Sequence, residues 1–127
     1  MESIRILIVD DVPHVRQGLA AVLGLASRNL GARIEVVGEA ENGSEAIRQA
    51  QNLHPDVILM DLEMPVMDGY EATRRIKTHS PGCRVIALTI HDDETARRHA
   101  SQAGVDDFIV KGAPMDSLIH AMTKDKE

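Results

Sequence analysis

The 127-residue sequence predicts a doubly wound α/β fold, in which helices cover both faces of a five-stranded parallel sheet. Short apolar runs alternate five times with segments of helical spacing, which is the pattern of repeated βα units. The run at residues 57–60 is continuously apolar, as expected of a strand buried on both faces. No internal repeat or change in composition divides the chain, so we expect one domain over residues 1–127.

The strand candidates are short apolar runs that end at a polar residue or a turn. They are residues 4–9, 34–37, 57–60, 85–88 and 108–110. Helix signals follow each of them. Asn42 with Glu45, and Asp68 with Glu71, have the spacing of a capping box. The remaining signals are Pro13 and Pro114 as helix openers, Asp92–Asp93 as a helix start and Gly104 as a helix end.

Composition and charge exclude several function classes. The net charge is -6 and the chain has no basic stripe, so we do not expect this domain to bind nucleic acid directly. No apolar run approaches the length of a membrane span, and residues 1–5 lack the pattern of a signal peptide. A single cysteine, Cys83, is compatible with a reducing compartment, and we expect a cytoplasmic protein.

Polar side chains stand where four of the predicted strands end: Asp10, Asp11, Asp61, Thr89 and Lys111. The carboxyl ends of parallel strands meet at one edge of a doubly wound sheet, so these groups should converge. Two carboxylates about 5 Å apart repel by roughly 3 kcal/mol at an effective dielectric constant of about 20. A cluster of hard oxygen ligands therefore suits Mg²⁺. A carboxylate beside Mg²⁺ and an ammonium group can accept a phosphoryl group.

With these residues in place, the sequence resembles the receiver domain of bacterial two-component response regulators over essentially its whole length. The matching motifs are residues 7–11 (LIVDD), 60–69 (MDLEMPVMDG), 87–89 (ALT) and 108–111 (FIVK). Each motif alone is weak, but the four in this order form a specific pattern.

The resemblance implies a function for each site residue. Asp61 would be the phosphoacceptor, and Mg²⁺ would be held by Asp11, Asp61 and the backbone carbonyl of Glu63, with Asp10 acting mainly through water. Lys111 would bind the phosphoryl group, Thr89 would be the switch hydroxyl and Phe108 the aromatic side chain that moves with it. The resemblance also implies a sensor histidine kinase as partner, and the flavodoxin-like strand order 2-1-3-4-5.

Finer details resemble the NarL/FixJ (LuxR-type) subfamily, at residues 37–43 (VGEAENG), 88–93 (LTIHDD) and 110–114 (VKGAP). Members of that group usually continue into a helix-turn-helix domain that binds DNA. We therefore expect an excised receiver whose output domain, which controls transcription, is absent from this chain; the alternative is a stand-alone receiver that acts by protein contact. The resemblance also implies homodimerisation on phosphorylation. The segment 114–123 has no arginine, which favours a dimer surface on the first and last helices.

Other functions fit the residues less well. A flavodoxin needs a hydroxyl-rich loop after the first strand, whereas Asp10 and Asp11 would repel a phosphate there. A dehalogenase-type phosphatase places its nucleophile on the first strand, and the P-loop motif GxxxxGK[ST] does not occur. Asp10 and Asp11 could instead cap the first helix, and Phe108 could be an ordinary core residue. We expect the six histidines on the surface and Arg97–Arg98 on a solvated helix face.

Overall fold

The computed structural model describes residues 3–30 and 33–123, which form one parallel sheet with helices on both of its faces. The strands of the described chain are β1 (Ser3–Val9), β2 (Arg33–Ala40), β3 (Val57–Asp61), β4 (Arg84–Thr89) and β5 (Asp107–Val110). The helices are α1 (Pro13–Leu30), α2 (Gly43–Leu53), α3 (Gly69–His79), α4 (Glu94–Ala103) and α5 (Met115–Thr123). The strand order is β2-β1-β3-β4-β5, which confirms the predicted fold class.

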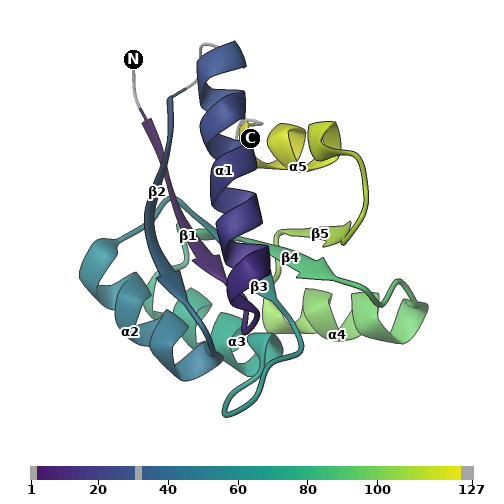
Figure 1. Ribbon diagram of the computed structural model, residues 1–127. Helices are drawn as coiled ribbons and strands as arrows, with labels where there is room; N and C mark the ends of the chain where they lie inside the picture. Colours follow the sequence, from purple (N-terminus) through teal and green to yellow (C-terminus); the bar gives the residue numbers. More distant parts are fainter. Residues whose placement is uncertain (1–2, 31–32, 124–127) are drawn as a thin grey trace.

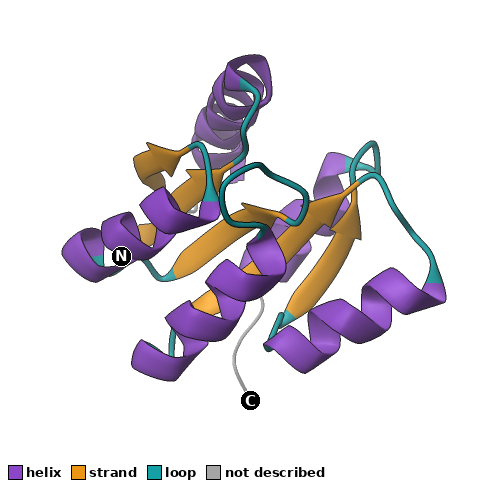
Figure 2. Cartoon of the chain, turned by 90° about the horizontal axis from the view of Figure 1, so that it is seen from below, coloured by secondary structure: helices purple, strands orange, loops and turns teal. Residues whose placement is uncertain are grey.

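The sheet separates two hydrophobic cores. Helices α1 and α5 lie on one face and α2, α3 and α4 on the other (Figure 1). Successive side chains of a strand point to opposite faces, so Ile6 and Ile8 pack toward α1 and α5, whereas Leu7 and Val9 pack toward α2 and α3. Figure 2 shows the strands side by side behind the second group of helices, with the loops gathered where the strands end.

The apolar runs predicted the central strands β3 and β4 because both strands are fully buried. Every residue of β3 and β4 is buried, which is what a continuous apolar run predicts for strands with neighbours on both sides. Strand β1 pairs with β3, and β3 pairs with β4, all in parallel. The carboxyl ends of these three adjacent strands therefore lie together at one edge of the sheet.

Some predicted boundaries are wrong by a few residues. The second strand was expected at 34–37 but β2 continues to Ala40, with a shift in register opposite Ile6 and Leu7. An edge strand can carry exposed polar residues such as Glu39, so the apolar run did not show its full length. Likewise, β4 begins at Arg84 rather than at residue 85, and α5 begins at Met115, just after the predicted opener Pro114.

The predicted N-caps form, but neither glutamate closes its capping box. The Glu45 carboxylate accepts a hydrogen bond from the backbone N–H of Glu41 at 3.1 Å, one residue before the cap. Asn42 accepts a hydrogen bond from the backbone N–H of Glu45, and Asp68 accepts one from that of Glu71. The Glu71 carboxylate does not complete a capping box, because it binds two arginines of its own helix, Arg74 at 2.7 Å and Arg75 at 2.9 Å.

Gly69 allows α3 to begin directly against the end of β3. A Cβ atom at this position would lie 2.2 Å from the backbone oxygen of Asp61. Gly112 has a different role, since its φ of 95° lies in the left-handed region that favours glycine. The described peptide bonds are all trans, including the bond after Lys111, as expected where no proline follows.

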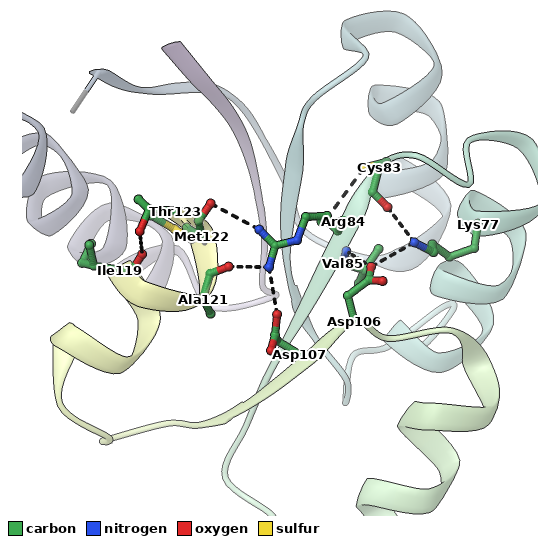
Figure 3. Close-up of polar contacts among 10 residues, drawn as sticks. All are labelled: Lys77, Cys83, Arg84, Val85, Asp106, Asp107, Ile119, Ala121, Met122 and Thr123. Carbon is green, nitrogen blue, oxygen red and sulfur yellow. Dashed lines mark hydrogen bonds and ion pairs between the residues drawn. The ribbon is translucent and has the colours of Figure 1, made fainter. Parts of the chain in front are cut away.

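Two basic side chains, Arg84 and Lys77, bind the chain at the start of β5, at the end of the sheet opposite the acidic residues (Figure 3). Arg84 is buried; its guanidinium donates to Asp107 at 2.9 Å and to the backbone carbonyls of Ala121 and Met122 in α5. Lys77 of α3 donates to Asp106 at 2.9 Å and to the carbonyl of Cys83 at 2.8 Å. These contacts connect both helical layers to the start of β5.

Candidate functional site

Three carboxylates gather where the central strands end. One oxygen from each of Asp10, Asp11 and Asp61 lies within 4.8 Å of the others. Asp61 is the last residue of β3 and is 6% exposed, and Asp10 follows β1 and is 1% exposed. Asp11 is exposed, so the cluster is open to solvent on one side. The structure thus brings together the three acids that the sequence predicted.

Lys111 follows β5 and enters the same cluster from the far side of β4. Its Nζ lies 2.9 Å from Oδ2 of Asp10 and 3.7 Å from Oδ1 of Asp61. The backbone N–H of Lys111 donates to the carbonyl of Thr89 at 2.7 Å, which fixes the chain at this point. Lys111 is therefore a member of the cluster and not a solvated loop residue.

Backbone hydrogen bonds hold the two buried acids in place. The backbone N–H of Val12 donates to Oδ1 of Asp10 at 2.9 Å, and that of Glu63 donates to Oδ1 of Asp61 at 3.3 Å. Arg16 of α1 donates to the backbone carbonyl of Asp10 at 2.7 Å and pairs with Glu39 at 2.9 Å. Sequence reasoning did not identify Arg16, because nothing in its spacing from the acids indicates this contact.

The electrostatic environment makes Asp61 difficult to ionise. Burial raises the pKa of Asp61 from 3.8 to about 6, with further upward contributions from Asp10 and Asp11, and the positive charge of Lys111 partly opposes the increase. Burial by itself would lower the pKa of Lys111, but the hydrogen bond to Asp10 and the charges of Asp61 and its neighbours raise it overall. One ammonium group therefore does not balance three carboxylates.

Thr89 and Phe108 lie beside this cluster on adjacent strands. In the β4–β5 register, Ala87 is opposite Phe108 and Thr89 is opposite Val110. Alternate residues of a strand share a face, so Thr89 and Phe108 lie on the same side of the sheet. Thr89 is 2% exposed, and its hydroxyl accepts a hydrogen bond from the backbone N–H of His91 at 3.1 Å. The switch roles of both residues stay predictions.

Phe108 is half-buried, and an arginine covers one face of its ring. The guanidinium carbon of Arg97 lies 4.6 Å from the ring centroid, and its Nε lies 2.6 Å from Oδ1 of Asp92. Arg97 was expected on a solvated helix face; it is exposed, but it also makes this cation–π contact. The sequence does not reveal the contact, because it depends on how α4 is rotated against β5.

Glu63 and His91 face each other next to the cluster. Nε2 of His91 lies 3.0 Å from Oε1 of Glu63, and both side chains are about half exposed. The pair connects the loop after β3 to the loop after β4. All six histidines are exposed, as predicted, and Cys83 is buried, in agreement with a structural role.

The donor set fits a small divalent cation. Carboxylate oxygens in small number, with one side of the cluster open to water, match the ligand preference of Mg²⁺. The excess of negative charge in the cluster favours binding of a cation. The loop after β1 presents Asp10 and Asp11, which would repel the phosphate of a flavin. The geometry therefore supports acceptance of a phosphoryl group rather than binding of a nucleotide cofactor.

No helix among residues 3–30 and 33–123 is long and apolar enough to cross a membrane.

Comparison with curated proteins identifies relatives among bacterial regulators. The response regulator protein VraR of Staphylococcus aureus is 44% identical over 124 residues, which cover 96% of this chain and 56% of VraR. The transcriptional regulatory protein DegU of Brevibacillus brevis is 36% identical over 120 residues, covering 94% of this chain and 49% of DegU. The chain thus spans about half the length of the curated relatives it matches.

Solved structures give the same result. The signal receiver domain of NarL from Mycobacterium tuberculosis superposes with a TM-score of 0.86 at 30% identity, covering 95% of this chain and 94% of that one. A LuxR-family two-component response regulator from Aurantimonas sp. SI85-9A1 has a TM-score of 0.84 at 32% identity, covering 94% of this chain and 82% of that one. The family description "response regulator receiver domain" matches residues 6–123. The chain therefore belongs to the response regulator receiver domain family, with relatives of the NarL and LuxR type.

Proposed function

We propose that this chain accepts a phosphoryl group on Asp61 in a Mg²⁺-dependent reaction and changes conformation as a result. The observation that carries the proposal is the position of Lys111, whose Nζ lies within 4 Å of both buried acids, Asp10 and Asp61. An ammonium group at this point can pair with a phosphoryl oxygen once the phosphoryl group is on Asp61.

Four groups of the chain would hold the cation. They are the side chains of Asp10, Asp11 and Asp61, with Asp10 acting mainly through water, and the backbone carbonyl of Glu63. When bound, Mg²⁺ would offset negative charge on the transferring phosphoryl oxygens. Binding would also lower the pKa of Asp61, which burial otherwise raises, and so keep its carboxylate ionised.

The chain's own residues account for the transfer step. A carboxylate oxygen of Asp61 attacks the phosphorus of the donor, a new P–O bond forms, and the bond to the donor's leaving group breaks with its electron pair. Lys111 exchanges its contacts with the acids for a contact with a phosphoryl oxygen. The Thr89 hydroxyl, which now accepts a bond from His91, keeps its own hydrogen available for donation to another phosphoryl oxygen.

We further propose that Thr89 and Phe108 transmit the modification. Movement of the Thr89 hydroxyl toward the phosphoryl group would shift the β4–α4 loop, and Phe108 on the same face of the sheet would change its position with it. The Arg97 guanidinium over the Phe108 ring connects this change to α4. A pre-existing equilibrium between two arrangements would thus shift on phosphorylation.

The partners follow from the same reaction. The donor would be a sensor histidine kinase in the cytoplasm. Residues 1–127 would act as one receiver domain joined to an output domain that controls transcription, as the name of the DegU relative suggests. Phosphorylation would promote homodimerisation, and DNA would be bound only by the output domain. A receiver that acts alone by protein contact is the alternative.

Intact-protein mass after incubation with acetyl phosphate tests the central reaction. The wild-type chain should gain one phosphoryl group only when Mg²⁺ is present. Asp61→Asn should gain none, whereas Asp116→Asn, which changes an exposed acid of α5, should behave like the wild type. A wild-type chain that stays unmodified with Mg²⁺, or an Asp61→Asn variant that is modified as fast as the wild type, would refute the proposal.

A further inference from the structure

Arg16 connects three segments of the chain next to the acidic cluster. It lies near the start of α1, where its backbone N–H donates to the carbonyl of Val12 at 3.2 Å. Its Nη1 donates to the backbone carbonyl of Asp10 at 2.7 Å, and its Nε donates to Oε1 of Glu39 at 2.9 Å. Asp10 directly follows β1, and Glu39 lies near the end of β2. One guanidinium therefore holds together the ends of two strands and the start of a helix.

The peptide group that Arg16 binds carries Asp11. A peptide bond is planar, so the carbonyl oxygen of Asp10 and the Cα of Asp11 belong to one rigid unit. Asp11 is exposed, and its carboxylate makes no hydrogen bond or ion pair with any residue in the described part of the chain. The Asp10 carboxylate, in contrast, is held by the N–H of Val12 and by Lys111, both at 2.9 Å. The position of the Asp11 carboxylate thus depends on its backbone, which Arg16 fixes.

The two contacts of the guanidinium differ in what they contribute. The Arg16 side chain is 16% exposed and that of Glu39 is 42% exposed, so their ion pair adds little to stability. The pair instead orients the guanidinium, which leaves Nη1 directed at the Asp10 carbonyl. Arginine can do this because its nitrogens form a rigid planar fork, whereas lysine offers a single nitrogen on a flexible chain.

We propose that Arg16 is a positioning residue of the cation site, which holds the peptide between Asp10 and Asp11 so that the Asp11 carboxylate faces the ion. This inference rests on the proposed function and adds a residue to its cation site. Arg16 carries only hydrogen-bond donors and cannot itself be a ligand. Replacing residues that hold metal ligands in place commonly weakens metal binding by about 10-fold to 100-fold.

The charge of Arg16 acts in the opposite direction to its proposed role. A positive group near a cation site repels the cation, so loss of the charge alone would tighten binding of Mg²⁺. Loss of the positioning contact would weaken it. The sign of the change in Mg²⁺ affinity therefore distinguishes the two effects.

Urea denaturation at increasing Mg²⁺ concentrations measures this affinity apart from stability. The unfolding midpoint without Mg²⁺ reports the stability of the fold, and its increase with Mg²⁺ gives the Kd of the ion. Arg16→Met/Glu39→Gln removes one positive and one negative charge, so the net charge is unchanged. We expect its Kd for Mg²⁺ to rise about tenfold, with a metal-free midpoint close to that of the wild type. Arg16→Lys keeps the charge but loses the fork, and its Kd should rise about threefold or more.

Phosphorylation by acetyl phosphate gives a second measurement on the same variants. The Mg²⁺ concentration at half the maximal rate should rise by the same factor as the Kd. The rate at saturating Mg²⁺ should change by less than about twofold, because a positioning residue of the cation site affects binding of the ion and not the transfer itself.

Arg28→Met is the matched control, because Arg28 is an exposed arginine in the last turn of the same helix. It should leave the Kd for Mg²⁺ at the wild-type value. An unchanged or tighter Mg²⁺ affinity in Arg16→Met/Glu39→Gln, or an equal loss in Arg28→Met, would overturn the inference. If the double variant does not fold, Arg16→Lys decides by the same criterion. A wild-type chain that Mg²⁺ does not stabilise would refute the proposed function itself, and the two failures are thereby distinguished.

Discussion

Replacing Asp61 by asparagine should stabilise the metal-free protein near neutral pH. The pKa of Asp61 rises from 3.8 to about 6 in the folded chain, chiefly because its carboxylate is buried. The ionised form is therefore disfavoured in the folded state by at most about 3 kcal/mol. Water that reaches the open side of the cluster screens part of this, so we expect a gain of about 1 to 2 kcal/mol for Asp61→Asn.

The gain should depend on pH in a defined way. In the unfolded chain Asp61 loses its proton near pH 3.8, and in the folded chain near pH 6. Between these values the folded state binds more protons, so this group lowers the stability of the wild type as the pH rises. Asparagine does not titrate. The difference between variant and wild type should therefore be small below about pH 4, increase up to about pH 6 and remain constant above it.

Urea denaturation over this pH range, in the presence of a chelator, measures the difference in free energy of unfolding. Asp116→Asn, an exposed acid outside the cluster, should show no comparable gain. Added Mg²⁺ should stabilise the wild type more than Asp61→Asn, because it binds the folded state and the variant lacks one ligand. An Asp61→Asn variant less stable than the wild type near neutral pH, or a difference that does not vary with pH, would refute the reasoning.

Three further predictions concern single side chains. Arg84→Ala should lower the free energy of unfolding by about 3 to 5 kcal/mol, because it removes a buried charge that binds Asp107 and the end of α5. Urea denaturation measures this, with the exposed Arg98→Ala as the control. Equal stabilities of the two variants would contradict the prediction. Thr73→Val should raise the stability by about 1 kcal/mol, because the buried hydroxyl of Thr73 has no hydrogen-bond partner within the described chain; a lower thermal midpoint would count against this. Lys111→Met should slow phosphorylation by acetyl phosphate about 100-fold, and a rate near that of the wild type would show that Lys111 is not needed.

The sequence predicted the fold because the deciding signals are local. The continuous apolar run of β3 and the polar residues that stop each strand are visible without any tertiary contact. Once the strands are parallel and ordered, the convergence of Asp10, Asp61 and Lys111 follows from topology. The residues of the site were therefore predictable from the sequence, but the distances between their atoms were not.

Other features depend on contacts between segments far apart in the sequence. The predicted fourth strand began at residue 85 because the apolar run begins there, and the partners of Arg84 in α5 lie 37 and 38 residues away. The position of Arg97 over Phe108 depends on the rotation of α4. The full length of β2 was not visible because an edge strand needs no continuous apolar run.

Mapping the modified residue tests the account most directly. Borohydride reduces an aspartyl phosphate to homoserine, so fragmentation mass spectrometry after treatment with acetyl phosphate, Mg²⁺ and borohydride locates the acceptor. We predict homoserine at position 61 alone, and none when Mg²⁺ is omitted. Homoserine at position 10 or 11, or a modification that forms equally well without Mg²⁺, would contradict the assignment of Asp61 as the phosphoacceptor.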